Sequence, residues 1–257
     1  MQIDLNDKVA LVTGSAHRVG KAIALALAEQ GMHIIVHYNR TDPDKVRDTL
    51  LDIKSKGVEA YEIQADISKP EGVTEVMDAV KEKFGRLHVL VNSASAFPSG
   101  DLLDVTVESW DLAMNVNLRA PFLFTQQAAR LMQENDKAGG SIINICDQGA
   151  DAPWPKRPHH GISKWGLWML TQVSAVSLGP SIRVNAIVPG PVMKTDDGMS
   201  DEQWAIMGDH LPLKRTGEGA DIGQAVVFLA TQNFITGAKL HVNGGEHLTY
   251  PEHKTLD

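Results

Sequence analysis

Short apolar segments alternate with longer amphipathic segments along the chain, and this alternation restricts the fold more than any other feature. Three of the short segments, 9–13, 88–92 and 141–146, are almost uninterrupted apolar residues, which is typical of strands covered on both faces of a sheet. Strands that alternate with helices predict an α/β fold, a doubly wound parallel sheet of about seven strands with helices on both faces. The expected strands are 9–13, 33–38, 58–64, 88–92, 141–146, 182–188 and 239–243, and the expected helices are 18–31, 42–57, 71–85, 107–132, 160–179 and 219–232.

The chain has 257 residues and contains no repeat, low-complexity tract or long polar linker, so we expect one domain over 1–257. One long irregular region, 189–218, contains a short helical pattern around 200–208. A long loop in a compact domain is more often functional than idle. Because this region follows the sixth expected strand, at the carboxyl edge of the sheet, we predict that it is a substrate lid.

Composition argues against several classes of protein. The net charge of −8 disfavours a protein that binds nucleic-acid phosphates. Cys146 is the single cysteine, so an internal disulfide is excluded, and the Cys/His spacing of a zinc site is missing. The longest uncharged run, 165–182, contains Thr, Gln, Ser, Gly and Pro and is expected to be a buried helix and its exit. The first residues have no signal-peptide pattern. We expect a cytoplasmic protein with no metal and no nucleic-acid or membrane partner.

The first expected strand leads into the turn TGSAHRVG, residues 13–20, and then into a helix. Such a turn points backbone N–H groups and a helix N-terminus at a phosphate. Gly14 is expected to permit the tight turn and Gly20 the close packing of helix on strand. Two glycines around a strand end also occur in ordinary turns, so other segments must decide whether a nucleotide binds.

The end of the second expected strand, HYNR at 37–40, indicates whether the nucleotide is NAD(H) or NADP(H). An NAD site requires an acidic residue there for the ribose 2′-hydroxyl, and this tetrapeptide has none. Arg18 and Arg40 are available instead, and a guanidinium suits a 2′-phosphate, although each arginine could also be a solvated surface charge. NADP(H) is therefore the predicted cofactor. Asp66 closes the third strand and is placed to meet the adenine amine, while the small residues of 91–95 allow backbone to approach a ligand.

Seven motifs in order resemble the short-chain dehydrogenase/reductase family over nearly the whole chain. They are TGSAHRVG, in which Arg18 replaces a glycine, ADIS (65–68), VNSAS (91–95), VNLRAPF (116–122), IRVNAIVPG (182–190), PGPVMKT (189–195) and HVNGG (241–245). The resemblance implies a Rossmann-type domain, Asn117 as the active-site asparagine, Lys164 as the ribose-binding lysine, and 189–195 as the loop beside the nicotinamide. The implied cofactor-binding set is Gly14, Arg18, Val19, Gly20, His37, Tyr38, Asn39, Arg40, Asp66, Ile67, Asn92, Ala94, Lys164, Pro189, Gly190, Val192 and Thr195.

Within that family the chain is most similar to the pteridine reductases. These also carry an arginine in the glycine turn, here Arg18, and an HYxR-like end to the second strand. They have a serine and an aromatic after the fourth strand, here Ser95 and Phe97, and aspartate where most members have serine, here Asp147. The resemblance implies that Ser95 and Phe97 contact the substrate, with the Phe97 ring stacked on a flat heterocycle. A core aromatic is the alternative for Phe97.

His160 departs from the family pattern. Asp147, His160 and Lys164 stand thirteen and then four residues apart, the interval at which the family has Ser, Tyr and Lys. The imidazole is shorter than a phenol, and Lys164 disfavours its charged form. We expect Asp147 to be the principal proton donor, because a carboxyl in an apolar pocket holds its proton more tightly. Asp147 could instead cap backbone amides of its own loop. His160 is then a substitute acid acting through water, a passenger in the site, or the mark of a lost activity.

The expected function is that of an NADPH-dependent reductase of a pterin-like or other small carbonyl or imine substrate. Its predicted catalytic set is Asp147, His160, Lys164 and Asn117. The alternative is a binding protein that keeps the NADP(H) pocket without the chemistry, and the retention of Asp147, Lys164 and Asn117 favours the enzyme. The expected helix 160–178 carries more apolar surface than one sheet face covers, which predicts a homo-oligomer, and the family resemblance implies a homotetramer.

Overall fold

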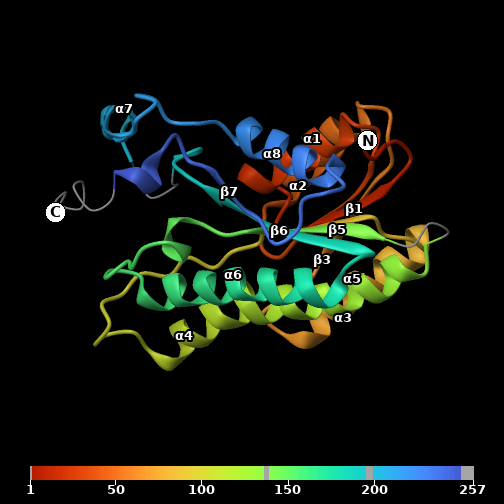
Figure 1. Ribbon diagram of the computed structural model, residues 1–257, viewed down its shortest axis with the longest axis horizontal. Coiled ribbons are helices and arrows are strands. Elements are labelled where there is room, and N and C mark those ends of the chain that lie inside the picture. The colour runs from red at the N-terminus through yellow and green to blue at the C-terminus, as the bar shows by residue number, and fades with distance from the viewer. Residues whose placement is uncertain (1, 136–138, 195–198, 250–257) are drawn as a thin grey trace.

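The computed structural model describes residues 2–135, 139–194 and 199–249 and contains a seven-stranded parallel sheet (Figure 1). The strands are β1 (Val9–Val12), β2 (His33–Tyr38), β3 (Ala60–Gln64), β4 (Val89–Asn92), β5 (Gly140–Ile145), β6 (Ile182–Pro189) and β7 (Lys239–Val242). Their order is β3-β2-β1-β4-β5-β6-β7. The predicted fold is confirmed, and the ends of each strand lie within two residues of the predicted ends. The apolar runs located these strands because a parallel sheet covered on both faces has few polar positions.

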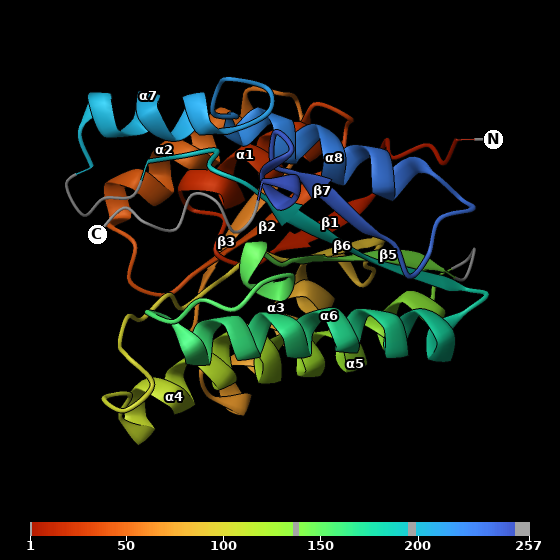
Figure 2. The same ribbon diagram turned by 60° about the vertical axis from the view of Figure 1, so that its left-hand side comes forward.

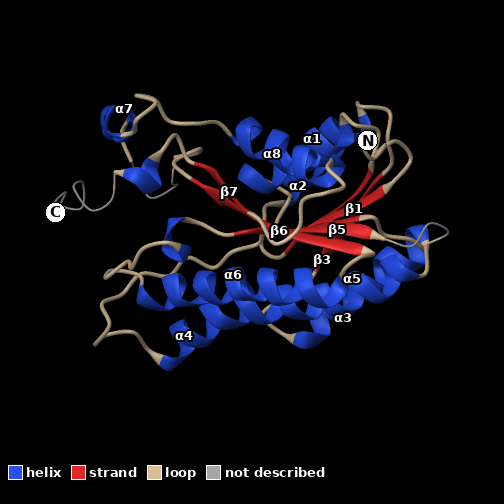
Figure 3. Ribbon diagram, in the orientation of Figure 1, coloured by secondary structure: helices blue, strands red, loops and turns tan. Residues whose placement is uncertain are grey.

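Helices cover both faces of the sheet (Figures 1 and 2). Figure 3 shows the same layers by secondary structure, with the strands between two groups of helices. One face carries α1 (Arg18–Ala28), α2 (Pro43–Lys54) and α8 (Gly219–Thr231), and the other carries α3 (Pro70–Phe84), α4 (Val107–Met114), α5 (Ala120–Gln133) and α6 (Pro158–Leu178). The short helix α7 (Asp201–His210) lies apart from both layers, in the region predicted to be a lid. Within the described ranges, none of the helices has the length and apolar character to cross a membrane.

The two faces pack two separate apolar cores, because successive side chains of a strand point to opposite faces. In β1, Ala10 and Val12 belong to the core that also contains Ile23 of α1. Val9 and Leu11 belong to the core on the opposite face. Burial on both faces holds the carboxyl ends of the strands in a fixed array, and the loops that follow these ends carry the site.

One predicted helix, 107–132, is interrupted. The structure divides it into α4, a π-helical turn η1 (Asn115–Arg119), and α5. Periodicity cannot reveal this turn, because the apolar pattern continues through it. π turns inside helices occur frequently at functional sites, and this one carries Asn117, which is completely buried.

Candidate active site

A cavity of about 830 Å³ opens at the carboxyl ends of the strands, around β1 and β4. Connections run in opposite directions from these two strands, and ligands of open α/β sheets bind at such a point. Most of the residues predicted for the site line this cavity. They are Gly14, Arg18, Val19, Gly20, His37, Tyr38, Asn39, Arg40, Asp66, Ile67, Ala94, Ser95, Phe97, Asp147, His160, Lys164 and Pro189.

A few predicted cofactor residues are not among those that line the cavity. Asn92 is buried on β4, where its side-chain amide donates to Oδ1 of Asn144 (2.8 Å). Gly190 and Val192 follow β6, and Val192 is 8% exposed. Thr195 lies outside the described residues. A role for these four residues stays a prediction.

Several residues that line the cavity were not predicted. His17, Thr41, Asp42 and Lys45 flank Arg18 and Arg40 in the sequence, and this proximity was the available signal. Leu112 and Val116 reach the cavity from α4 and η1 by long-range packing, for which no local signal exists. The others are Ser68, Ser93, Ala96, Ile145 and Cys146.

The glycine turn has little room for side chains. Gly14 has φ +66°, and a Cβ there would lie 2.9 Å from Cα of Ala94. A Cβ on Gly20 would lie 2.2 Å from the carbonyl oxygen of Gly14, so Gly20 packs against the turn itself. Arg18 has φ +54°, in the region that favours glycine, which explains why the resembling motif has glycine at this position.

His37 supports this turn from behind. The backbone N–H of Gly14 donates to Nδ1 of His37 (3.1 Å), and Nε2–H donates to the carbonyl of Ala65 (3.1 Å). Burial lowers the pKa of His37 to about 4, so the ring is neutral near pH 7 and can accept at Nδ1. His37 therefore ties the end of β2 to the turn that follows β1.

The charged side chains that line the cavity near this turn include Arg18, Arg40 and Asp66. The Arg18 guanidinium donates to the carbonyl of Lys194 (2.7 Å), and Arg40 is exposed. The hydroxyl of Ser68 donates to Asp66 Oδ1 (2.7 Å) and lowers the pKa of that carboxyl. Asp66 is therefore a carboxylate at neutral pH and can accept a hydrogen bond from an amine.

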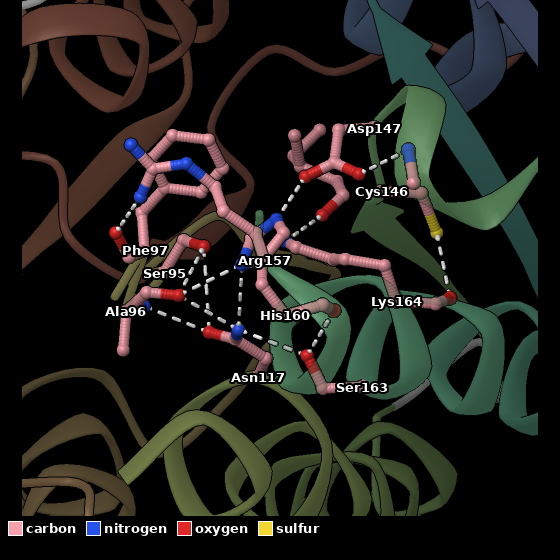
Figure 4. Close-up of polar contacts among 12 residues, drawn as sticks. Ser95, Ala96, Phe97, Asn117, Cys146, Asp147, Arg157, His160, Ser163 and Lys164 are labelled. Atoms are coloured by element: carbon pink, nitrogen blue, oxygen red, sulfur yellow. Dashed lines mark hydrogen bonds and ion pairs between the residues drawn. The ribbon is translucent and has the colours of Figure 1, made fainter. Parts of the chain in front are cut away.

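Asp147 and His160 are directly hydrogen-bonded, and Figure 4 shows the two side chains pointing toward each other. Nε2 of His160 meets Oδ2 of Asp147, while Nδ1 lies 3.0 Å from the carbonyl oxygen of Ala96. A carbonyl oxygen only accepts, so Nδ1 carries a hydrogen. One proton therefore remains for the contact between Nε2 and Oδ2, and the two groups share it. Asp147 Oδ1 accepts from the N–H of Gly149 (2.8 Å).

The pKa of Asp147 corrects one prediction. Burial by itself raises the pKa of this carboxyl, as expected from the sequence. The hydrogen bond from His160 and the positive charge of Lys164 outweigh burial, so the pKa of Asp147 is lowered. The prediction that Asp147 holds its own proton through burial is therefore wrong: its proton depends on the imidazole. Sequence reasoning missed this because it did not pair Asp147 with His160.

Asn117 and Lys164 form hydrogen bonds with the backbone segments next to the Asp147–His160 pair. The side-chain amide of Asn117 donates to the carbonyl of Ala96 (2.8 Å) and to Oγ of Ser163 (3.0 Å), and its Oδ1 accepts from the Ala96 N–H (2.8 Å). Both amide hydrogens of Asn117 are thus used, so Asn117 does not donate to Nδ1 of His160, although the two nitrogens are close. Nδ1 is therefore free to carry a hydrogen and donate it to the carbonyl of Ala96. Lys164 donates to the carbonyl of Ile145 (2.9 Å). Asn117 lies behind the cavity lining, whereas Lys164 is part of it.

Aromatic rings pack around His160 at this end of the cavity. Phe97 is 43% exposed, and its ring centroid lies 4.5 Å from that of His160, nearly perpendicular to it. Trp154, which the sequence could not place, stacks parallel to His160 at 5.9 Å. The Arg157 guanidinium lies 3.8 Å from the Phe97 ring centroid and donates to the Phe97 carbonyl (2.6 Å). These contacts set the orientation of Phe97 at the rim.

Comparison with known proteins extends over almost the whole chain. A family model described as enoyl-(acyl carrier protein) reductase matches residues 14–247. A 3-oxoacyl-[acyl-carrier-protein] reductase FabG of Staphylococcus epidermidis is 35% identical over 246 residues, 94% of this chain and 100% of the relative.

Two solved structures have the same fold. A protein of Sinorhizobium meliloti 1021 described as a short-chain alcohol dehydrogenase has a TM-score of 0.87 and 34% identity, covering 94% of this chain and 97% of the other. A blue fluorescent protein from a metagenomic library, in complex with NADPH, has a TM-score of 0.86 and 35% identity, covering 95% of this chain and 99% of the other.

Proposed function

The chain belongs to the short-chain dehydrogenase/reductase family, a family of oxidoreductases, and on that basis we propose that it is an NADPH-dependent reductase of a pterin-like or other small carbonyl or imine substrate. The observation that carries the proposal is the Asp147–His160 pair, which shares one proton at the wall of a nucleotide-sized cavity. The carbonyl alternative is supported by the similarity to a 3-oxoacyl reductase. The pterin alternative rests on Arg18, Phe97 and Asp147.

The residues of the cavity fit a dinucleotide with a 2′-phosphate. Gly14 and Gly20 let the backbone of the turn approach a pyrophosphate, and Asp66 is available to the adenine amine. Arg18 and Arg40 line the cavity where β2 ends without an acidic residue. A similar protein was solved with NADPH. Bound NADPH supplies the hydride that reduces the substrate carbon.

The protein supplies the proton. Both members of the pair line the cavity, but the Asp147 side chain is 20% exposed and that of His160 only 1%. Asp147 is therefore the member that can reach a substrate oxygen or nitrogen. The shared proton passes through Asp147 to the substrate, which leaves Asp147 as a carboxylate and His160 as a neutral imidazole with its hydrogen on Nδ1. The pair then takes up one proton from water through the cavity. Lys164 places a positive charge beside these groups.

Phe97 and Ser95 are proposed to position the substrate. Phe97 lies at the exposed rim of the cavity next to His160, where a flat heterocycle could stack on its ring. The hydroxyl of Ser95 lies 3.3 Å from Oδ1 of Asn117, and Ser95 also lines the cavity. The comparisons do not support the alternative of an inactive binding protein, since the similar proteins include a reductase and a protein described as a dehydrogenase.

Region 189–218 is proposed to be a substrate lid. Of its described residues, Pro189 lines the cavity, and Lys194 receives the Arg18 hydrogen bond through its carbonyl. The Lys194 ammonium pairs with Asp201 at the start of α7. The region is thus tied to the cofactor end of the cavity through Lys194, and an ion pair within the region joins Lys194 to the start of α7.

A homotetramer is also proposed. Five exposed apolar side chains follow one stripe of α6: Ile162 (46% exposed), Trp165 (50%), Met169 (55%), Val173 (55%) and Val176 (86%). Such a stripe favours an interface between copies. Light scattering coupled to size-exclusion chromatography tests this proposal, and a monomer at all concentrations would contradict it.

The proposed activity is tested by following NADPH oxidation against dihydrobiopterin, dihydrofolate, a 3-oxoacyl thioester and a simple diketone. We expect turnover of at least one of these compounds. Binding of NADPH without turnover of any would support the inactive alternative.

A further inference from the structure

A second polar cluster lies outside the cavity and joins β7 to the loop that carries Asp147. Asp151 contacts Lys239 Nζ through one carboxylate oxygen and Nε2 of His241 (2.8 Å) through the other. Lys239 and His241 are two residues apart on β7, so they point to the same side of the strand. We call Asp151, Lys239 and His241 the β7 clamp.

A parallel contact reaches the same loop. The side-chain amide of Asn243, directly after β7, lies 3.4 Å from Oε1 of Gln148. Gln148 begins the short 3-10 helix η2 (Gln148–Ala150), and Asp151 follows it. Both Gln148 and Asn243 are 4% exposed. β7 and the residue after it therefore hold η2 at both ends.

η2 in turn holds Asp147. The N–H of Gly149 donates to Asp147 Oδ1 (2.8 Å), and the N–H of Ala150 donates to the Asp147 carbonyl (2.9 Å). Asp147 Oδ2 is left to meet His160. A displacement of η2 would therefore rotate or shift the carboxylate that shares the proton with His160.

The clamp differs from an ordinary surface ion pair. The side chains of Asp151 and Lys239 are 21% and 17% exposed, and the Lys239 ammonium lies 4.8 Å from the ring centroid of Trp168. Burial raises the pKa of Asp151, but hydrogen bonds from Lys239 and His241 outweigh it and lower the pKa. Exposed ion pairs contribute little to stability. The Asp151 carboxylate is partly shielded from solvent and has two partners, Lys239 and His241, on one strand.

We propose that Asp151 is a positioning residue for the proton donor: through η2, the β7 clamp aligns the carboxylate of Asp147 with His160. This inference rests on the proposed reductase function for its effect on turnover, but the alignment itself is a property of the fold.

The first experiment compares Asp151→Ala and Asp151→Asn with Glu29→Ala, which removes an exposed ion pair with Lys56 (2.8 Å) far from the site. Because small misplacements of a catalytic group cost up to about 10²-fold, we expect Asp151→Ala to lower kcat by about ten- to a hundredfold. KM for NADPH should stay within about twofold, since the clamp does not line the cofactor cavity. Asp151→Asn should lose less, because its amide oxygen can still accept from His241, and Glu29→Ala should match the wild type.

A double variant tests whether Asp151 acts through Asp147. If it does, adding Asp151→Ala to Asp147→Ala lowers kcat no further. Losses that multiply in the double variant would overturn the proposal. If Asp151→Ala does not fold, Lys239→Met removes the clamp from the β7 side and is compared in the same way.

Amide hydrogen exchange gives a readout that needs no turnover. In Asp151→Ala we expect faster exchange in peptides covering 146–152, where the Gly149 and Ala150 amides are bonded to Asp147, and no change in β1 peptides. Unchanged exchange in 146–152 would overturn the proposal that the β7 clamp holds η2 and Asp147 in place. Faster exchange in a protein whose wild type reduces none of the test substrates would support the clamp and count against the proposed function alone.

Discussion

Nε2 of His160 is hydrogen-bonded to Oδ2 of Asp147, thirteen residues earlier in the chain. Each of the two side chains has a second hydrogen bond that fixes its orientation. Nδ1 of His160 donates to the carbonyl of Ala96, and Oδ1 of Asp147 accepts from the N–H of Gly149. The proton of the site therefore belongs to the pair, and substitution of either residue changes the other.

The two alanine variants of this pair should differ in turnover. Asp147→Ala removes the group that faces the cavity and should lower kcat by about 10²- to 10⁴-fold, the range for a lost general acid. His160→Ala leaves the Asp147 carboxyl in place but removes the imidazole that shares its proton. This variant should have a kcat about tenfold lower, which corresponds to a barrier roughly 1.4 kcal/mol higher. The double variant should resemble Asp147→Ala. A dead His160→Ala enzyme beside a healthy Asp147→Ala enzyme would reverse the two roles.

Arg18→Gly should weaken NADPH binding by about 1.5–3 kcal/mol, the scale of a hydrogen bond to a charged group, and leave NADH binding nearly unchanged. The substitution relieves the positive φ of this residue, so the backbone of the turn is not expected to suffer. Fluorescence titration with both cofactors measures the difference. Arg47→Gln, which removes an exposed arginine paired with Asp44 on α2, serves as the control. Equal losses for both cofactors would make Arg18 a structural part of the turn.

His37 predicts a pH dependence of stability. Its pKa is lowered from 6.5 to about 4 by burial, so between these values the unfolded chain binds a proton that the folded chain does not. Stability therefore falls as the pH decreases from about 6.5 through about 4, by on the order of 3 kcal/mol for this group. Urea unfolding of the wild type and of His37→Gln at pH 7 and pH 4 measures the free energy of unfolding. The decrease in this free energy from pH 7 to pH 4 should be smaller in the variant. His88, whose pKa is also about 4, contributes equally to both proteins and cancels. Equal decreases would show that His37 titrates normally.

Phe97→Ala should raise KM for a flat heterocyclic substrate about three- to tenfold, corresponding to about 0.5–1.5 kcal/mol of lost stacking. NADPH affinity should change little, because Phe97 lies at the His160 end of the cavity. Phe234→Ala is the matched control, since Phe234 is 99% exposed and absent from the cavity lining. If KM for the substrate is the same in both variants, Phe97 does not stack on it.

Much of the fold could be predicted from the sequence because strand burial appears directly in the residue order. The run 9–13 is apolar at nearly every position, and β1 is buried on both faces. The glycine turn and most of the residues that line the cavity could be predicted because they follow strand ends. The Asp147–His160 pair could not be predicted with its proton state, since that depends on Ala96 and Asn117, which come from other segments.

The π turn η1 also determines the phase between α4 and α5. An α-helix advances about 100° per residue, so deleting one residue from 115–119 would rotate α5 by roughly that angle relative to α4. Phe124, now fully buried in the sheet core, would turn toward another side, and Asn117 would lose its registration with Ala96 and Ser163. Outside Asn117, this five-residue segment should therefore tolerate substitution far better than insertion or deletion.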